Sequence, residues 1–125
     1  MIHFDTNFLI AATVPASPAH SQLRVWASNG ESFGVSSIAL AEYLCGPLDA
    51  TAEAIAQQMC PQPEPFLPAD AALAATLFNK TGRRSRTLAD CMIAAVAIRC
   101  NAKLATVNAT DFSLFQSFGL KLMSA

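Results

Sequence analysis

The segment from Leu88 to Ile98 constrains the fold more than any other part of the chain, because Asp90 is its only charged residue. A helix that is apolar almost all round has to be buried almost all round. The segment is also much shorter than the roughly 20 apolar residues that span a bilayer. We therefore expect it to form a core helix that other elements cover.

Short apolar segments alternate with helical patterns on both sides of this helix. The predicted strands are Ile2 to Phe4, Phe33 to Ser36, Lys103 to Val107 and Leu120 to Met123. In the first half of the chain, we predict a helix that Pro15 ends, a helix capped by Ser17 and stopped at Gly30, and a helix from Ile38 to Cys45 that Ser37 caps and Gly46-Pro47 ends. Further helices are predicted from Asp49 to near Met59, from a cap at Asp70 to Phe78, and from a cap at Thr87 to about Cys100. A helical turn is predicted from Asp111 to Phe115.

Strands and helices in alternation are typical of a parallel sheet with helices on both faces. We predict an α/β fold, a three-layer sandwich with a central parallel sheet flanked by helices, in one domain spanning residues 1–125. Ligands of such folds bind at the carboxyl ends of the strands, where the strand order reverses.

The composition is strongly apolar, with 53% hydrophobic and 14% charged residues. This predicts either a well-covered core or a surface that another chain covers. No secretory signal pattern or spanning segment is visible, so we expect a cytoplasmic protein without a membrane anchor. Cys45, Cys60, Cys91 and Cys100 form no C-x-x-C pair and lack histidines at zinc spacing, so we interpret them as thiols of a reducing compartment.

Four of the nine acidic residues occupy unusual places. Asp5 comes directly after a predicted strand, and Asp111 lies just beyond the carboxyl end of another, although Asp111 could instead cap the turn that follows it. Glu42 and Asp90 interrupt very apolar helices. The others lie in loops, at helix starts or on expected exposed faces, and need no special role: Glu31, Asp49, Glu53, Glu64 and Asp70.

Each unusual carboxylate also has an ordinary interpretation. Asp5 could simply cap a helix, and position alone favours neither interpretation. Glu42 could occupy the only wet face of its helix. Asp90 could form a capping box with Thr87, or a local ion pair with Arg86.

Taken together, the four carboxylates indicate a cation site. Carboxylates gathered in one crevice repel one another by roughly several kcal/mol per close pair at an intermediate dielectric, unless they take up protons or bind a divalent cation. Oxygen ligands without cysteine or histidine favour Mg²⁺ or Mn²⁺. Such an ion lowers the pKa of a bound water and stabilises charge on a phosphate, which suits phosphodiester cleavage.

Four of the eight basic residues lie within seven positions just before Asp90, although the net charge is −1. A solvated loop explains such a cluster more often than a binding patch does. Its position just before Asp90 nevertheless makes it a candidate binding patch. The residues are Lys80, Arg83, Arg84 and Arg86.

Four motifs in this order resemble those of PIN-domain ribonucleases, in particular the VapC-type toxins of VapBC toxin–antitoxin pairs, and the resemblance covers essentially the whole chain. The motifs are Asp5-Thr6-Asn7 after the first strand, Ser36-Ser37-Ile38-Ala39-Leu40-Ala41-Glu42 ahead of Gly46, Leu88-Ala89-Asp90-Cys91-Met92-Ile93-Ala94-Ala95, and Thr106-Val107-Asn108 leading to Asp111-Phe112.

The resemblance implies a metal cluster of Asp5, Glu42, Asp90 and Asp111, with Asp5 and Asp90 as the principal Mg²⁺ (or Mn²⁺) ligands. It implies RNA cleavage that leaves a 5′-phosphate and a 3′-hydroxyl, a homodimer, and silencing by a VapB-type antitoxin. We expect a structured RNA such as tRNA or rRNA as the substrate. The side chains expected to orient carboxylates or waters are Thr6, Asn7, Thr106 and Asn108, and those expected to contact RNA phosphates are Lys80, Arg83, Arg84 and Arg86.

Other functions fit less well. Haloacid-dehalogenase phosphatases need a second aspartate where Asn7 stands, and a receiver domain needs a lysine for which Lys103 is the only match. A catalytically inactive PIN-like binding module would not need all four acids. No glycine-rich phosphate-binding motif is present, so a nucleotide-binding domain has no support.

Overall fold

The computed structural model describes residues 1–46 and 49–123, in which four strands form one parallel sheet. The strands follow the order β2-β1-β3-β4. Every neighbouring pair is parallel, and Ile2 of β1 is in register with Phe33 of β2 and with Lys103 of β3. The strands are β1 (Ile2–Phe4), β2 (Phe33–Val35), β3 (Lys103–Ala105) and β4 (Lys121–Leu122).

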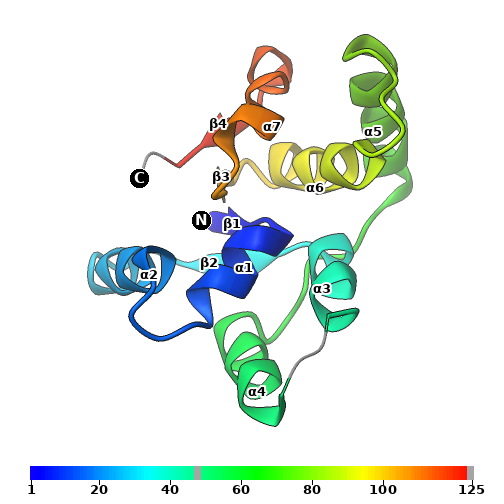
Figure 1. Cartoon of the computed structure of the whole chain (residues 1–125). Coiled ribbons are helices and arrows are strands. Elements are labelled where there is room, and N and C mark those ends of the chain that lie inside the picture. Colours follow the sequence, from blue (N-terminus) through cyan, green and yellow to red (C-terminus); the bar gives the residue numbers. More distant parts are fainter. Residues whose placement is uncertain (47–48, 124–125) are drawn as a thin grey trace.

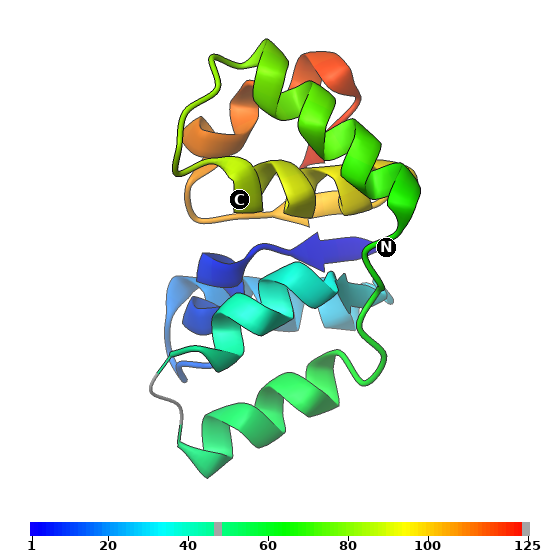
Figure 2. The same ribbon diagram turned by 90° about the vertical axis from the view of Figure 1, so that its right-hand side faces the viewer.

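Helices cover both faces of this sheet. In Figure 1, which looks roughly along the strands, α3 and α6 lie on one side, with α5 outside α6, and α2 lies on the other side. Helix α4 lies at the β2 end of the molecule, as Figure 2 also shows. The helices are α1 (Thr6–Ala12), α2 (Pro18–Ser28), α3 (Ser37–Leu44), α4 (Ala50–Met59), α5 (Pro68–Lys80), α6 (Leu88–Arg99) and α7 (Ala109–Ser113), followed by the 3₁₀ turn η1 (Gln116–Phe118). The predicted α/β sandwich is confirmed.

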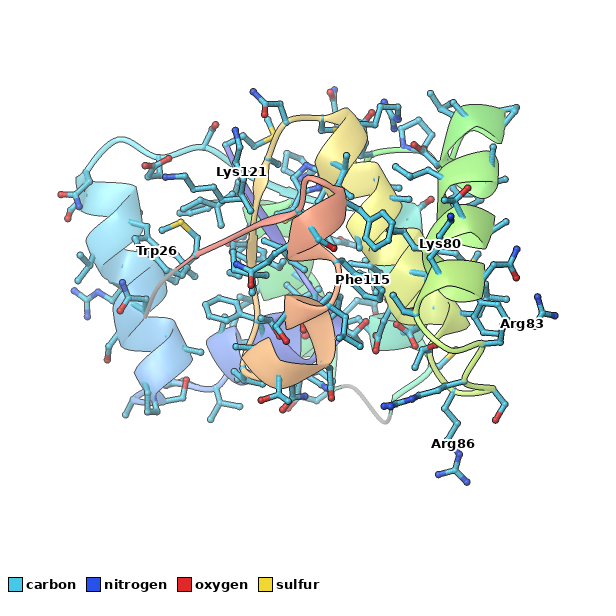
Figure 3. All side chains as sticks on the ribbon, turned by 90° about the horizontal axis from the view of Figure 1, so that it is seen from above. Trp26, Lys80, Arg83, Arg86, Phe115 and Lys121 are labelled. Atoms are coloured by element: carbon cyan, nitrogen blue, oxygen red, sulfur yellow. The ribbon has the colours of Figure 1, made fainter. Side chains whose placement is uncertain are left out.

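The core surrounds β1 and α6. All three residues of β1 are buried, and so is every residue of α6 from Ile93 to Ala97, as its apolar sequence predicts. On the α2 side, the Phe8 ring stacks on Trp26 with centroids 5.5 Å apart. On the α6 side, Phe115 is buried edge-on against Phe112. Figure 3 shows Trp26 and Phe115 on the two sides of the sheet.

The strand order creates a crevice between β1 and β3. The chain passes from β1 to β2 at one side, and then crosses back to place β3 on the other side of β1. The carboxyl ends of β1 and β3 therefore meet where the order reverses, which is the usual ligand position in open α/β sheets. The amide of Asp5 donates to the carbonyl of Ala105 at 3.1 Å and joins the two strand ends.

Several predicted boundaries and caps are wrong by one to three residues. Ser36, not Ser37, caps α3, because its hydroxyl accepts the Ala39 amide at 3.1 Å. Thr87 holds the N-cap position of α6, as predicted, but its hydroxyl donates to the Arg84 carbonyl and accepts no helix amide. The predicted strands at the C-terminal half are longer than β3 and β4, and α7 lies earlier than the predicted turn. Helix α3 ends at Leu44, and Pro47, expected to end it, lies outside the described residues.

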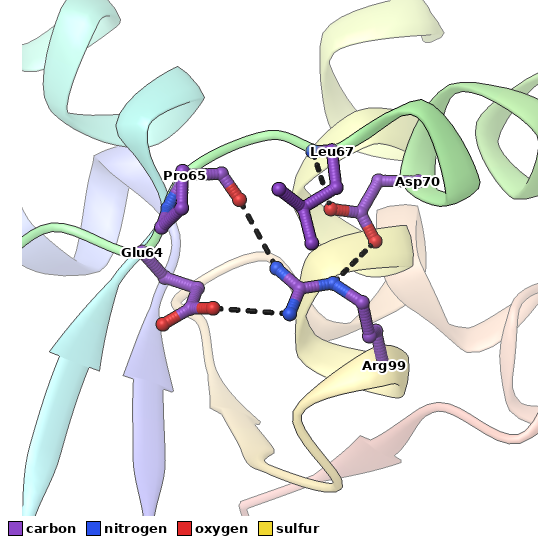
Figure 4. A network of polar contacts seen from close by, with 5 residues as sticks. All are labelled: Glu64, Pro65, Leu67, Asp70 and Arg99. Atoms are coloured by element: carbon purple, nitrogen blue, oxygen red, sulfur yellow. Dashed lines mark hydrogen bonds and ion pairs between the residues drawn. The ribbon is translucent and has the colours of Figure 1, made fainter.

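Asp70 was predicted to cap α5 and Glu64 to need no special role, and the structure corrects both. Asp70 lies inside the helix, 1% exposed, where its carboxylate accepts the Leu67 amide at 2.9 Å. The Arg99 guanidinium at the end of α6 bonds to Asp70 at 2.8 Å, to Glu64 at 3.0 Å and to the Pro65 carbonyl at 3.0 Å (Figure 4). Arg99 thereby joins α6 to α5 and to the loop before it.

Between residues 1 and 46 and between 49 and 123, no helix combines the length and the apolar character that crossing a bilayer would require.

Candidate active site

A cavity of about 110 Å³ opens at the carboxyl edge of the sheet, in the crevice between β1 and β3. The four carboxylates singled out by sequence all line it, although they come from the end of β1, from α3, from α6 and from α7. The structure therefore brings together residues that are far apart in the sequence. The lining residues are Asp5, Thr6, Asn7, Glu42, Asp90, Asn108, Asp111 and Phe112.

Asp5 caps a helix and lines the cavity at the same time, so its two interpretations do not compete. One carboxylate oxygen accepts the Phe8 amide at 2.7 Å at the start of α1. The other accepts the Thr106 hydroxyl at 2.5 Å. Burial raises the pKa of this carboxyl, hydrogen bonds from Thr106 and Phe8 oppose the rise, and the charges of Glu42 and Asp111 add to it.

Asp90 lies in the first turn of α6, facing the other acids. Burial raises its pKa to about 6, and the charges of Glu42, Asp111 and Asp5 add to the effect. The carboxylates therefore interact across the cavity, as we expect of acidic groups that lie in one crevice.

Neither local interpretation of Asp90 describes its surroundings. The Thr87 hydroxyl, expected in a capping box, bonds to the Arg84 carbonyl at 2.9 Å. In the part of the chain that the structure describes, Arg99 makes the only ion pairs, so Arg86 is not paired with Asp90.

Glu42 and Asp111 occupy the open side of the cavity, and both are exposed to solvent. Glu42 lies on the wet face of α3, as its ordinary interpretation predicts, and also lines the cavity. Its carboxylate accepts the Thr6 hydroxyl at 2.6 Å. Asp111 lies in the first turn of α7 and does not cap it, since Asn108 holds the capping position.

The side chains expected to orient the acids divide into two kinds. The Thr106 hydroxyl donates directly to Asp5, and the backbone amide of Asn108 donates to the same hydroxyl at 2.9 Å. The turn after β3 therefore holds the Asp5 carboxylate in one orientation. Asn7 and Asn108 line the cavity with their side chains.

The donor set fits a hard divalent cation, because every titratable group in the cavity is a carboxylate and the remaining polar groups are hydroxyls and amides. Within residues 1–46 and 49–123, however, no three Asp, Glu, His or Cys side chains converge closely enough to hold one ion. The four carboxylates line one cavity, but no three of them surround a single cation position. Coordination by three of them requires the exposed Glu42 and Asp111 side chains to turn inwards, and the bond from Thr6 to Glu42 then has to shift.

A larger cavity of about 460 Å³ adjoins the first, with Asp90 and Asp111 in both linings. It lies between the loop before α6 and the segment from α7 to Phe115. Its lining residues are Thr81, Arg84, Arg86, Thr87, Asp90, Thr110, Asp111, Ser113, Leu114 and Phe115.

Only two of the four residues predicted to contact RNA line this cavity. Arg84 and Arg86 line it, whereas Lys80 and Arg83 do not. The Arg83 guanidinium donates to the Asn79 side chain and lies over the Phe78 ring, 5.6 Å from its centroid. Figure 3 shows Arg83 and Arg86 extending in different directions.

The family model of the PIN domain matches residues 2–115, so the chain belongs to the PIN-domain family. PIN domains are a family of nucleases. No curated protein sequence matches the chain.

Solved structures show the same fold. A chain of VapBC2 from Rickettsia felis, bound to a promoter DNA fragment, is similar with a TM-score of 0.75 and 23% identity over 98% of both chains. FitAcB from Neisseria gonorrhoeae gives a TM-score of 0.72 and 21% identity over 99% of this chain and 97% of that one. FitAB bound to an IR36 DNA fragment gives a TM-score of 0.69 and 21% identity over 98% of this chain and 94% of that one.

Proposed function

We propose that this chain is a Mg²⁺- or Mn²⁺-dependent endoribonuclease and the toxin of a type II toxin–antitoxin pair. The observation that carries the proposal is the cavity in which Asp5, Glu42, Asp90 and Asp111 meet, in a chain of a nuclease family. The proposal includes one domain over residues 1–125, cytoplasmic location and a homodimer.

Asp5 and Asp90 are the principal ligands in this proposal, with Glu42 and Asp111 completing the set. When bound, the cation lowers the pKa of a water and stabilises negative charge on the scissile phosphate. Burial disfavours the charged forms of Asp5 and Asp90 and raises the pKa of both. A bound cation offsets the cost of burying these two negative charges, so both carboxylates favour cation binding.

The hydroxyls have a positioning role. Thr106 donates to one oxygen of Asp5, whose other oxygen accepts the Phe8 amide. Thr6 donates to one oxygen of Glu42, so both carboxylates are held in a defined orientation. Oriented ligands lose less freedom on binding than mobile ones do.

Asp90→Asn and Asp5→Asn test the proposed chemistry. Each keeps the shape of the side chain, and asparagine still caps α1 at position 5. We expect both variants to fold and to lose cleavage of a total RNA preparation by at least a hundredfold, and we expect EDTA to abolish wild-type cleavage. Asp49→Asn, an equivalent change at the exposed cap of α4, should cleave like wild type. Unchanged cleavage by Asp90→Asn, or in EDTA, contradicts the proposal.

The toxin role is supported by the structural similarity to chains of VapBC2 and FitAB. We expect expression of the wild-type chain to arrest bacterial growth and expression of Asp5→Asn not to. A short gene next to this one should encode a VapB-type DNA-binding antitoxin whose product relieves the arrest. Light scattering of the purified chain at micromolar concentration measures whether it is a dimer.

The main alternative is a PIN-like module that binds RNA without cutting it. Calorimetry with Mn²⁺ separates the two, because a module without a working cluster should release or absorb no heat above that of Asp90→Asn. The aspartyl-phosphate alternatives would require a phosphorylated Asp5, which mass spectrometry after incubation with a phosphodonor detects.

A further inference from the structure

We propose that the cavity of about 460 Å³ holds a single unpaired nucleotide of the RNA, directly beside the phosphodiester bond at the acidic cluster. The inference rests on the proposed ribonuclease function for the identity of the polymer. It goes further by assigning a substrate subsite to Arg84, Ser113 and Leu114.

Position is the first reason. The two cavities share Asp90 and Asp111, so a ligand in the larger one continues into the smaller one past these carboxylates. A polymer whose scissile phosphate lies at the acids must place a neighbouring residue somewhere, and the larger cavity is the adjoining space.

Charge is the second reason. Arg84 and Arg86 line the cavity, and within the described residues neither makes an ion pair with a carboxylate. Their guanidinium groups are therefore available to an anion. An acidic peptide could use them, but it would carry more negative charge toward four carboxylates. A nucleotide carries one phosphate for the arginines and presents a neutral base to the rest of the lining.

The loop that carries Arg84 is held in place. Gly82 at φ 95° and Arg83 at φ 53° turn the chain sharply after α5. The Arg83 amide then donates to the Phe78 carbonyl at 3.0 Å. The Thr87 amide and hydroxyl both donate to the Arg84 carbonyl, at 3.0 and 2.9 Å. The backbone at Arg84 is thus fixed on both sides.

The lining suits a base. Leu114 is 50% exposed and offers an apolar surface, while the buried Phe115 closes the floor. Thr81, Thr110 and Ser113 also line the cavity. The hydroxyls of Thr81 and Ser113 donate to the Leu77 and Thr110 carbonyls, so their oxygens remain as acceptors for the donor groups of a base. A volume of this size falls in the range of small-molecule pockets, about 300–1,000 Å³. A base inside a helical stem is stacked and paired on both sides, so only an unpaired base can enter.

Binding of a four-nucleotide single-stranded RNA to the full chain in EDTA tests the inference, with fluorescence anisotropy as the readout. EDTA keeps the RNA intact, so the measurement does not depend on cleavage. Arg84→Ala should weaken binding at least tenfold, and Arg24→Ala, which removes the same charge from an exposed position of α2 outside both cavity linings, should stay within twofold. Ser113→Phe should weaken binding at least fivefold by filling the cavity, with circular dichroism showing an intact fold.

Equal losses for Arg84→Ala and Arg24→Ala would overturn the inference, because they would indicate a general attraction of RNA to positive charge. So would wild-type affinity in a folded Ser113→Phe, or equal affinity for a blunt RNA duplex. Poly-glutamate binding that exceeds RNA binding would also overturn it. The proposed function fails separately, if Mg²⁺-dependent cleavage survives in Asp90→Asn.

Discussion

The ionisation of Asp90 follows from its place at the start of a buried helix that faces other acids. Aspartate in solution has an ordinary pKa of 3.8, and burial with three neighbouring carboxylates raises that of Asp90 to about 6. The pKa of Asp5 is raised as well, again mainly by burial. Both side chains therefore oppose folding when they are ionised without a cation.

This shift predicts how the stability of the metal-free chain changes with pH. Between the unfolded value of 3.8 and the folded value of about 6, the folded chain holds more protons at Asp90 than the unfolded chain does. The contribution of Asp90 to stability is therefore present below that window and falls as pH rises through it. Urea unfolding in EDTA across the window should show a smaller decline for Asp90→Asn than for wild type. Parallel curves would contradict the prediction.

At the scale of single elements, the stability of α3 depends on a capping serine that the sequence does not distinguish from its neighbour. Ser36 and Ser37 are adjacent and chemically identical, yet only Ser36 bonds to a helix amide. We expect Ser36→Ala to lower the unfolding free energy by about 1 kcal/mol. Ser37→Ala should change it by less than about 0.5 kcal/mol, as is usual away from such features. Urea unfolding measures both, and a larger loss for Ser37→Ala would show that the cap is misassigned.

The packing of α5 against α6 depends on Arg99. Its guanidinium pairs with the buried Asp70 carboxylate and also holds Glu64 and the Pro65 carbonyl. Removing one partner of a buried pair leaves the other charge uncompensated, so Arg99→Met should lower the unfolding free energy by about 3 kcal/mol. Arg83→Ala, at an exposed arginine, provides the control. Similar effects of the two changes would mean that the Arg99 cluster contributes little.

For the molecule as a whole, the acidic cavity links folding to cation binding. A ligand that binds only the folded chain stabilises it, by about 2.7 kcal/mol when its concentration is a hundred times the Kd. We expect Mn²⁺ to raise the midpoint of thermal unfolding of wild type and to have much less effect on Asp90→Asn. Differential scanning calorimetry measures the shift. An equal rise in both chains would place the bound cation outside this cavity.

Much of the fold and site could be predicted because the relevant signals are local or follow from sheet topology. The apolar run of α6 indicated its burial, and carboxylates after two strands indicated a meeting point at one edge of a parallel sheet. The separation of Arg84 from Arg83 could not be predicted. Neighbours in a loop point in different directions according to the turn at Gly82, and that turn depends on contacts with α5.

The order of apolar and polar residues by itself determined the layered α/β architecture and the four acids of the candidate site, because periodicity and strand-end position are properties of short segments. Only the tertiary structure decided that Asp70 is buried against Arg99, that Thr106 orients Asp5, and that a second cavity adjoins the acids. These features join residues 29 and 101 positions apart. Contacts over such separations depend on how whole elements pack, and no local pattern records them.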